Sequence, residues 1–253
     1  MIKFTKRSYS EIKELFNDFI CRKNYFCNCF TLIEGNCDYF IDEHKTLFII
    51  RKKETDFYRI YCIAYTEEVF CSMLENLDKN HVINIPSKKS IDEFDALFTH
   101  YNYKQIAKYK RYRNVSFKSR GKTKCDYASL NDIDTIYKLL YENFSPITGY
   151  LPSYDDLHSM INKSEIFINR DKETDEVIGI IGCQIEKSQC YLPFWIDKGG
   201  QGLLLLFSVF NKMVESGIKR IYFWINSENT DTIKLHELLG AKFDGLTDYI
   251  YKK

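Results

Sequence analysis

The stretch QCYLPFWIDKGGQGLLLLFSVFNKMVES, Gln189 to Ser216, decides the fold of this chain. Its first part, CYLPFWID, is rich in aromatic and aliphatic residues, which is typical of a strand buried on both faces. Its last part is apolar almost all round for two turns and predicts a helix with little exposed surface. Between them, Gly199, Gly200 and Gly202 let the backbone turn and let a ligand approach main-chain amides. A strand, a glycine turn and a helix N-terminus together predict a phosphate site, because the first amides of a helix are unpaired and its dipole is positive there.

The spacing around the glycines excludes two common nucleotide sites. No Lys-Ser/Thr pair follows them, as a P-loop requires, and GGQG lacks the G-x-G-x-x-G spacing of a dinucleotide fold. After the turn the sequence predicts a helix, a strand from Arg220 to Ile225, and then NSENTDTIKLHELLGAKF, which ends in a helix with a glycine beyond it.

At this point the chain resembles the GNAT superfamily of acyl-CoA-dependent N-acyltransferases, whose motifs are Q/R-x-x-G-x-G/A and N-x-x-A-x-x-L-Y-x-x-x-G-F. Gly202 stands at the first required glycine, whereas Gly199 occupies the usual Arg/Gln position and Leu204 the usual small one. His236 stands where the family often has a tyrosine that serves as general acid. The positions that fit the second motif are Asn229, Thr232, Leu235 and Gly240, with Ala241 and Phe243 sharing the Gly-Phe ending. The resemblance covers roughly Cys125 to Lys253.

The resemblance implies a coenzyme site for acetyl-CoA in this half of the chain. Main-chain groups of the strand would face the thioester, amides of the turn and first helical turn would hold the diphosphate, and Lys198 would assist. Asn229 would either cap its helix or bond the coenzyme, and capping is favoured. The coenzyme-binding residues expected in this way are Phe194, Trp195, Ile196, Lys198, Gly199, Gly200, Gln201, Gly202, Leu203, Leu204 and Asn229.

The catalytic residues follow from the needs of acyl transfer to an amine. A strand amide near Trp195 would polarise the thioester carbonyl, and His236 would protonate the leaving thiolate, because histidine titrates near neutral pH. The alternative for His236 is a partly buried or surface residue without a chemical role. Glu186 and Asp197 end predicted central strands and could act as a base through water, although such carboxylates are usually only solvated. Tyr150 and Tyr154 are candidates for the acceptor site, and ordinary packing is the alternative for both.

Three functions remain open on these residues. The first is an enzyme that moves an acetyl or other acyl group from acetyl-CoA to a primary amine of a small molecule or peptide, by direct attack in a ternary complex. The second is a catalytically inactive GNAT-like module that binds coenzyme A or regulates another protein, because Gly199 and Leu204 depart from the motif. The third is an aminoacyl transferase that uses charged transfer RNA, which the near-neutral charge disfavours.

Composition supports a compact protein of the cytoplasm. The chain has 253 residues, a formal net charge of +1 and 16% aromatic residues, so we expect neither nucleic acid nor a membrane as partner. A homodimer is possible. The nine cysteines are an odd number without a secretion signal, so we expect free thiols. Four of them lie at Cys21, Cys27, Cys29 and Cys37, near His44, but no C-x-x-C occurs and we expect no metal.

The order of predicted elements repeats along the chain and indicates two GNAT-like α/β lobes in tandem, each a mixed sheet flanked by helices. We expect a degenerate first lobe over 1–115, a linker over 116–124 and the acetyltransferase lobe over 125–253. The first lobe has Tyr65, Thr66 and Glu67 where the second has its glycine turn, so it should bind no coenzyme. In detail we expect a helix from Phe4 to about Phe30, a strand pair within 101–114, and CYLPFWID as one strand of the central sheet.

Overall fold

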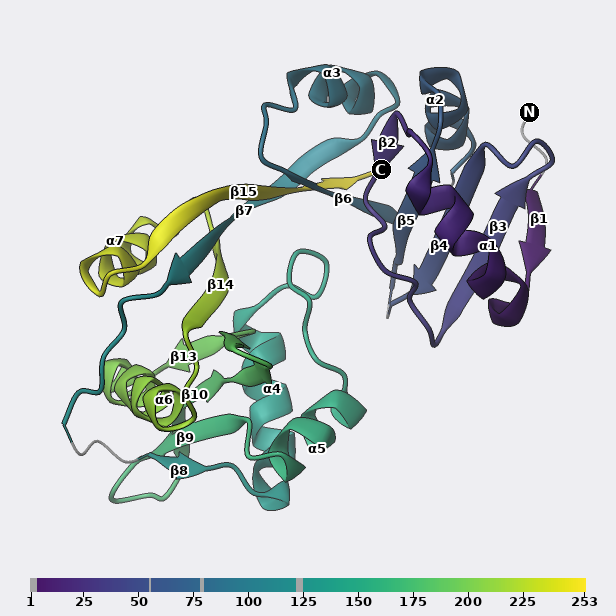
Figure 1. Ribbon diagram of the computed structural model, residues 1–253. Coiled ribbons are helices and arrows are strands. Elements are labelled where there is room, and N and C mark those ends of the chain that lie inside the picture. The colour runs from purple at the N-terminus through teal and green to yellow at the C-terminus, as the bar shows by residue number, and fades with distance from the viewer. Residues whose placement is uncertain (1–3, 55, 78–79, 122–124) are drawn as a thin grey trace. The chain divides into compact units, whose positions relative to one another are not determined.

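The computed structural model describes residues 4–54, 56–77, 80–121 and 125–253, and they form two compact units. The first unit comprises Met1–Lys108 with Thr247–Lys253, and the second comprises Tyr109–Leu246. Both have α/β architecture, with a mixed sheet and flanking helices, as the sequence predicts (Figure 1). The last seven residues count with the first unit, which differs from the predicted division at residues 116–124, because pairing of the terminal strand is not visible in local sequence pattern.

The first unit is a largely antiparallel sheet in the order β1-β3-β4-β5-β6-β15, with β2 also paired to β5. Its one parallel pair is β5–β6, which are connected through a helix. The elements are β1 (Phe4–Arg7), α1 (Tyr9–Cys21), β2 (Phe26–Cys27), β3 (Cys37–Asp42), β4 (Leu47–Lys53), β5 (Tyr58–Ala64), α2 (Glu67–Asn76), β6 (His81–Ser87) and α3 (Asp92–His100). The final strand β15 (Lys242–Lys252) joins this sheet through Thr247 to Lys252, opposite β6.

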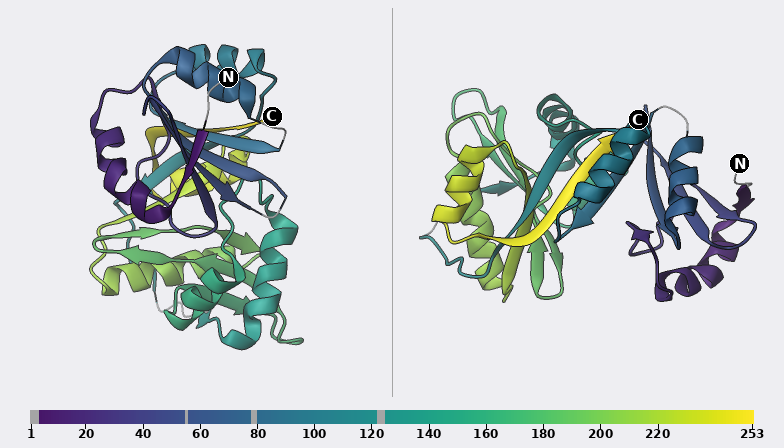
Figure 2. Two further views of the ribbon diagram at one scale, coloured as in Figure 1. Left: turned by 90° about the vertical axis from the view of Figure 1, so that its right-hand side faces the viewer. Right: turned by 90° about the horizontal axis from the view of Figure 1, so that it is seen from above.

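The helices of the first unit cover both faces of its sheet. Ile12, Phe16 and Phe19 of α1 pack against β3 and β4 on one face, while α2 and α3 pack on the other, as Figure 2 shows for α1 and α2. The predicted helix from Phe4 to Phe30 is therefore wrong in its extent. Ser8 ends β1 and caps α1 with a capping box to Glu11, and α1 ends at Cys21.

The second unit contains two sheets that meet around one helix. The first has the order β7-β14-β12-β11 and the second β13-β10-β9-β8. Its elements are β7 (Lys104–Asn114), β8 (Asp126–Tyr127), the 3-10 helix η1 (Leu130–Asp132), α4 (Ile133–Asn143), α5 (Tyr154–Asn162), β9 (Ile166–Arg170), β10 (Val177–Gly182), β11 (Gln184–Glu186), β12 (Gln189–Tyr191), β13 (Trp195–Asp197), α6 (Gly202–Glu215), β14 (Arg220–Asn226) and α7 (Thr230–Leu238). The strand pair expected within 101–114 is instead the single strand β7.

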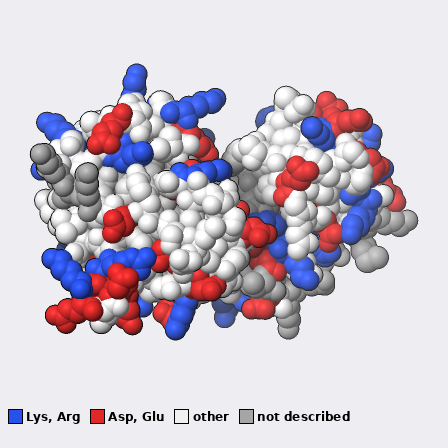
Figure 3. Space-filling view, turned by 90° about the horizontal axis from the view of Figure 1, so that it is seen from below, with Lys and Arg blue, Asp and Glu red and all other residues white. Residues whose placement is uncertain are grey.

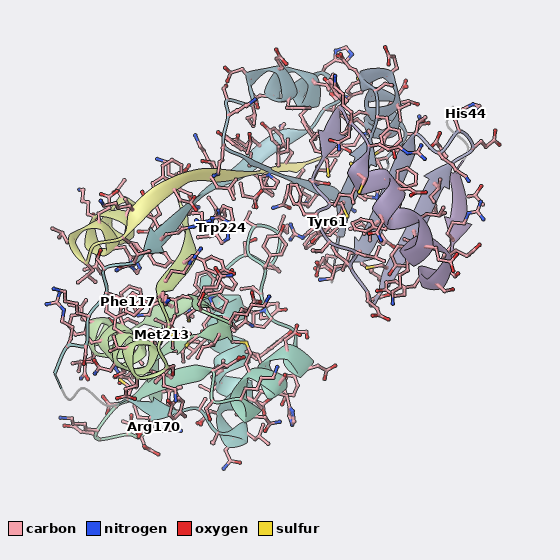
Figure 4. The ribbon with its side chains drawn as sticks, viewed as in Figure 1. His44, Tyr61, Phe117, Arg170, Met213 and Trp224 are labelled. Atoms are coloured by element: carbon pink, nitrogen blue, oxygen red, sulfur yellow. The ribbon has the colours of Figure 1, made fainter. Side chains whose placement is uncertain are left out.

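Helix α6 is the apolar centre of the second unit. Leu205, Leu206, Val209 and Met213 are fully buried and pack against strands of both sheets. In Figure 1, α6 lies on one side of β9, β10 and β13, and α4 and α5 lie on the other. Figure 4 shows Met213 on α6 close to Phe117, which packs against this core.

The described part of the expected linker is bound to α6. The side-chain oxygen of Asn211 accepts hydrogen bonds from Ser119 Oγ and Arg120 N, both at 2.8 Å, and its nitrogen donates to the carbonyl of Gly121. Residues 122–124 lie outside the described residues. The segment up to Gly121 is thus part of the second unit.

The cysteines are free thiols, as expected, and Cys29 and Cys62 are buried among apolar side chains. Within the described ranges, no three His, Cys, Asp or Glu side chains gather as a metal site. None of the helices in those ranges is both long enough and apolar enough to cross a bilayer.

Candidate active site

The predicted strand CYLPFWID is two strands that belong to different sheets. β12 pairs in parallel with β14, and β13 pairs antiparallel with β10. Pro193 lies between them and has no N–H to donate, so the ladder breaks there. The amide of Leu192 makes the last bond to β14, donating to Tyr222 O at 3.0 Å. Beyond this point β13 and β14 part, and each leaves one edge without a strand partner in the described residues.

Alternation along β13 tells which main-chain groups face the open edge. Phe194 O accepts from Gly182 N at 3.0 Å, and Lys198 N donates to Ile178 O at 2.8 Å, so these residues bond toward β10. Ile196, midway between them and paired with Ile180, shares this direction. The N–H and C=O groups of Trp195 and Asp197 therefore face the open edge. Of the three residues expected to face a thioester through main chain, only Trp195 is placed to do so.

The opposite edge belongs to β14. Because Tyr222 bonds to β12, the same alternation turns the main-chain groups of Trp224 toward the open side. Trp224 is labelled in Figure 4, and the guanidinium of Arg111 lies 5.7 Å from its ring centroid. The indole N–H of Trp195 on β13 is buried and has no hydrogen-bond partner among the described residues. The parted edges thus present unpaired donors and acceptors.

The glycine turn holds a carboxylate of its own chain. Asp197 Oδ1 accepts from the amides of Gly199 at 3.2 Å and Gln201 at 3.1 Å, and Oδ2 accepts from Gly202 N at 2.8 Å. Hydrogen bonds to a charged acceptor contribute about 1.5–3 kcal/mol each, so emptying the turn costs several kcal/mol. A diphosphate that used the amides of Gln201 and Gly202 would have to displace this carboxylate, and the amide of Leu204 already donates to Gln201 O at 2.9 Å.

Two of the three glycines lie in close contact with other side chains. A Cβ on Gly202 would lie 2.8 Å from Asp197 Oδ2 and 2.9 Å from Cζ2 of Trp195. A Cβ on Gly199 would collide with the side chain of Ile178. Gly200 has space around it but adopts a φ of +70°, a conformation that favours glycine. Contacts with Asp197, Trp195 and Ile178 and the backbone conformation of Gly200 therefore account for the glycines without a ligand.

Other residues expected to bind the coenzyme also have contacts within the chain. Lys198 Nζ lies 3.5 Å from the carboxylate of Glu142, so its charge is partly balanced. Leu203 and Leu204 begin α6 with 42% and 41% of their side chains exposed, so Leu204 does not close the turn. Asn229 caps α7 by accepting from Thr232 N at 3.2 Å. Of the two roles considered for it, capping and a bond to the coenzyme, this is the one that the sequence favours.

His236 is a buried histidine in the core beside β13. It is 4% exposed, and its ring lies 4.1 Å from that of Phe223 and 5.4 Å from that of Trp195 between centroids. Burial disfavours the imidazolium and lowers the pKa of His236 to about 4. The side chain is neutral at pH 7 and carries no acidic proton for a thiolate, so its predicted role as general acid lacks physical support.

The structure places Glu186 away from the open edge, and Tyr150 and Tyr154 in or just after the loop between α4 and α5. Glu186 pairs with Gln189 at the far end of the β11–β12 hairpin, whereas the edges part at the opposite end, after Tyr191. Tyr154 donates its hydroxyl to Asp134 Oδ1 at 3.0 Å, which ties α5 to α4 and raises the tyrosine pKa. Tyr150 is half exposed in the loop before α5. Their roles as base and acceptor-binding residues stay predictions.

The first unit has a corresponding junction between parallel strands, and its own residues fill that junction. β5 and β6 pair in parallel up to Ile60 and Ile83, and beyond them β2 takes the free edge of β5. The side chain of Asn28 accepts from Cys62 N at 2.7 Å and donates to Ile60 O and to Asn84 O. Asn28 thus bridges β5 and β6, and this unit offers no open edge there.

The feature that our sequence reading missed is Asp197 as a turn cap. An aspartate just before glycines readily accepts from main-chain amides a few residues on, and DKGGQG has that pattern. The pairing of Lys198 with Glu142 had no such signal, because 56 residues separate the two.

Solved structures with a similar fold identify this architecture. A tandem GNAT protein from the clavulanic acid biosynthesis pathway matches with a TM-score of 0.65 at 8% identity, over 100% of this chain and 98% of that one. A GCN5-related N-acetyltransferase from Sphaerobacter thermophilus matches with a TM-score of 0.62 at 11% identity, over 95% and 84% of the two chains. A GNAT-family acetyltransferase from Colwellia psychrerythraea matches with 0.59 at 12% identity, over 99% and 100%.

Sequence comparison adds nothing to this. No protein-family model matches the chain, and no curated protein matches it. The identities to the solved structures are low, so these likenesses establish the architecture. The chain has the fold of the GNAT superfamily, present as two lobes in tandem.

Proposed function

We propose that the second unit transfers an acyl group from a coenzyme A-type thioester, with acetyl-CoA the simplest donor, to a primary amine of a small molecule or peptide. The observation that carries this proposal is the parting of β13 from β14. An extended amide-containing arm can pair with the free edge of β13 as an added strand would. The main-chain groups of Trp195 and Asp197 are the partners available to it.

The proposed transfer needs only groups that the open edge provides and a neutral amine. The amine nitrogen attacks the thioester carbonyl carbon, the new C–N bond forms, and the C–S bond breaks. The proton lost by the amine is taken up by the leaving sulfur through solvent. The edge amide of Trp195 or Asp197 would donate to the carbonyl oxygen as negative charge develops there.

A second candidate is a GNAT-like module that binds a ligand without turnover. Two observations favour it: the carboxylate of Asp197 occupies the turn amides, and burial keeps His236 neutral. Transfer from charged RNA is disfavoured by the net charge of +1 and by the interspersed acidic and basic side chains on the face drawn in Figure 3.

The test separates binding from turnover. Donor binding is measured by ligand-observed NMR with acetyl-CoA, and turnover by thiol release against a panel of primary amines. Binding with amine-dependent thiol release supports the enzyme. Binding without release for every amine supports the non-catalytic module, and absence of binding contradicts both.

A further inference from the structure

We infer that the second unit recognises its donor by the thioester and pantetheine arm alone, and that Asp197 excludes the nucleotide diphosphate. The donor class is then an acyl pantetheine thioester without a nucleotide, either free or as the prosthetic arm of a carrier protein. This inference rests on the proposed function and names the donor for the same site.

Its first support is the contrast between the two parts of the site. The edge of β13 that carries the main-chain groups of Trp195 and Asp197 has no strand partner among the described residues. The turn, by comparison, has three amides bonded to a carboxylate from the same strand. The part that would bind the arm is available, and the part that would bind the diphosphate is filled.

Its second support is charge. A diphosphate at the turn would face the Asp197 carboxylate, which packs against Gly202, and like charges in contact repel. The nearest cation, Lys198, already has Glu142 as its partner at 3.5 Å. Helix α6 contributes no compensating side chain, because its first residues are Gly202, Leu203 and Leu204.

Its third support is the packing of Asp197 within the turn. The ring of Trp195 and the carboxylate of Asp197 lie against Gly202, with no room for a Cβ between them. Moving Asp197 out of the turn therefore removes both its hydrogen bonds and its contact with Gly202. The transfer step is otherwise unchanged: the amide forms, the thioester breaks, and the free thiol of the arm leaves with a proton.

The experiment compares acetyl-CoA with S-acetylpantetheine by ligand-observed NMR titration, which tolerates weak binding. For the wild-type protein we expect dissociation constants within about threefold of each other. For Asp197→Asn, which keeps the side-chain shape and removes the charge, we expect acetyl-CoA to gain at least tenfold over S-acetylpantetheine. Asp171→Asn is the matched control, because Asp171 caps the amides of Glu173 and Thr174 in another turn of the same unit.

Each outcome decides between the two proposals. A wild-type protein that prefers acetyl-CoA tenfold or more overturns the inference and leaves the proposed function standing. Failure of both donors to bind the wild type and Asp197→Asn overturns both. If Asp197→Asn does not fold, inhibition of S-acetylpantetheine binding by ADP in the wild type decides: no inhibition supports the inference, and competition overturns it. A carrier protein loaded with an acetyl arm, added in a final arm, distinguishes the carrier-borne source from the free one.

Discussion

The buried His236 makes a quantitative prediction about how stability depends on pH. Its pKa is about 4 in the folded protein and near the ordinary 6.5 when unfolded. A depressed folded pKa means that the unfolded state binds the proton more readily. Stability from this group is therefore complete above pH 6.5 and is lost as the pH falls toward 4.

The size of the effect follows from these two values. The free energy of proton binding depends on the factor one plus ten to the power of pKa minus pH. At pH 5 this factor is about 33 for the unfolded state and about 1.1 for the folded state, and their ratio of about 30 corresponds to about 2 kcal/mol. At pH 7.5 the same calculation gives about 0.1 kcal/mol. His236→Phe removes the titration, so its free energy of unfolding relative to wild type should rise by about 2 kcal/mol between pH 7.5 and pH 5. Any constant cost of the substitution cancels in this difference.

The assay is urea unfolding followed by tryptophan fluorescence. The chain has two tryptophans, Trp195 and Trp224, and both lie in the second unit, so the signal reports that unit. His158→Gln is the control, since His158 is exposed on α5, and it should reproduce the wild-type pH dependence. Parallel curves for wild type and His236→Phe across this pH range would refute a buried, neutral imidazole. Turnover of His236→Phe close to wild type would remove this residue from the mechanism.

Three further changes test the packing of the site and of the units. Gly202→Val should cost up to about 3 kcal/mol in urea unfolding, because a Cβ there meets Asp197 and Trp195. Gly200→Ala has space around it and should cost only about 1 kcal/mol, and equal costs for the two would contradict this packing. Asn28→Ala leaves three buried main-chain groups unpaired and should destabilise the first unit by about 3 kcal/mol in thermal unfolding by circular dichroism, with the tryptophan signal unchanged. Deleting 247–253 should remove hydrogen-exchange protection from the β6 amides that bond to β15, while the amides that bond to β5 keep theirs; unchanged protection throughout would show that this strand is dispensable.

The sequence predicts elements best where local pattern decides them. The strand expected from Arg220 to Ile225 is β14, and the apolar run after the glycine turn is helix α6. The tandem architecture also follows from the repeated order of elements. The helix expected from Phe4 to about Phe30 is shorter, since Ser8 caps α1 after the strand β1 and the helix ends at Cys21.

The site was harder to predict because its features are long-range. The division of CYLPFWID into β12 and β13 depends on their pairing with β14 and β10, which a local sequence pattern does not reveal. Burial of His236 depends on Phe223 and Trp195, which come from two strands. Motif position alone therefore suggested a catalytic acid where the fold places a neutral core residue.

Each unit contains a pair of parallel strands, and the two units differ in what lies beside that pair. In each unit, a strand leads through a helix to a parallel neighbour, β5 to β6 through α2 and β12 to β14 through α6. In the first unit, the segment between α1 and β3 supplies β2 and Asn28, and both bond to the edge of β5. The second unit has helix α5 between α4 and β9 instead, and within the described residues no strand from this segment pairs with β13 or β14 at the open edge.

Main-chain groups left without partners in a sheet edge must bond to water, to another chain or to a ligand. At the β5–β6 junction the first unit satisfies this requirement internally, whereas the second unit does not do so between β13 and β14 within the described residues. This difference supports the proposed binding site in the second unit independently of its glycine motif. This matters because the motif itself is occupied by Asp197, so that the edge of β13, and not the turn, carries the case for a thioester ligand.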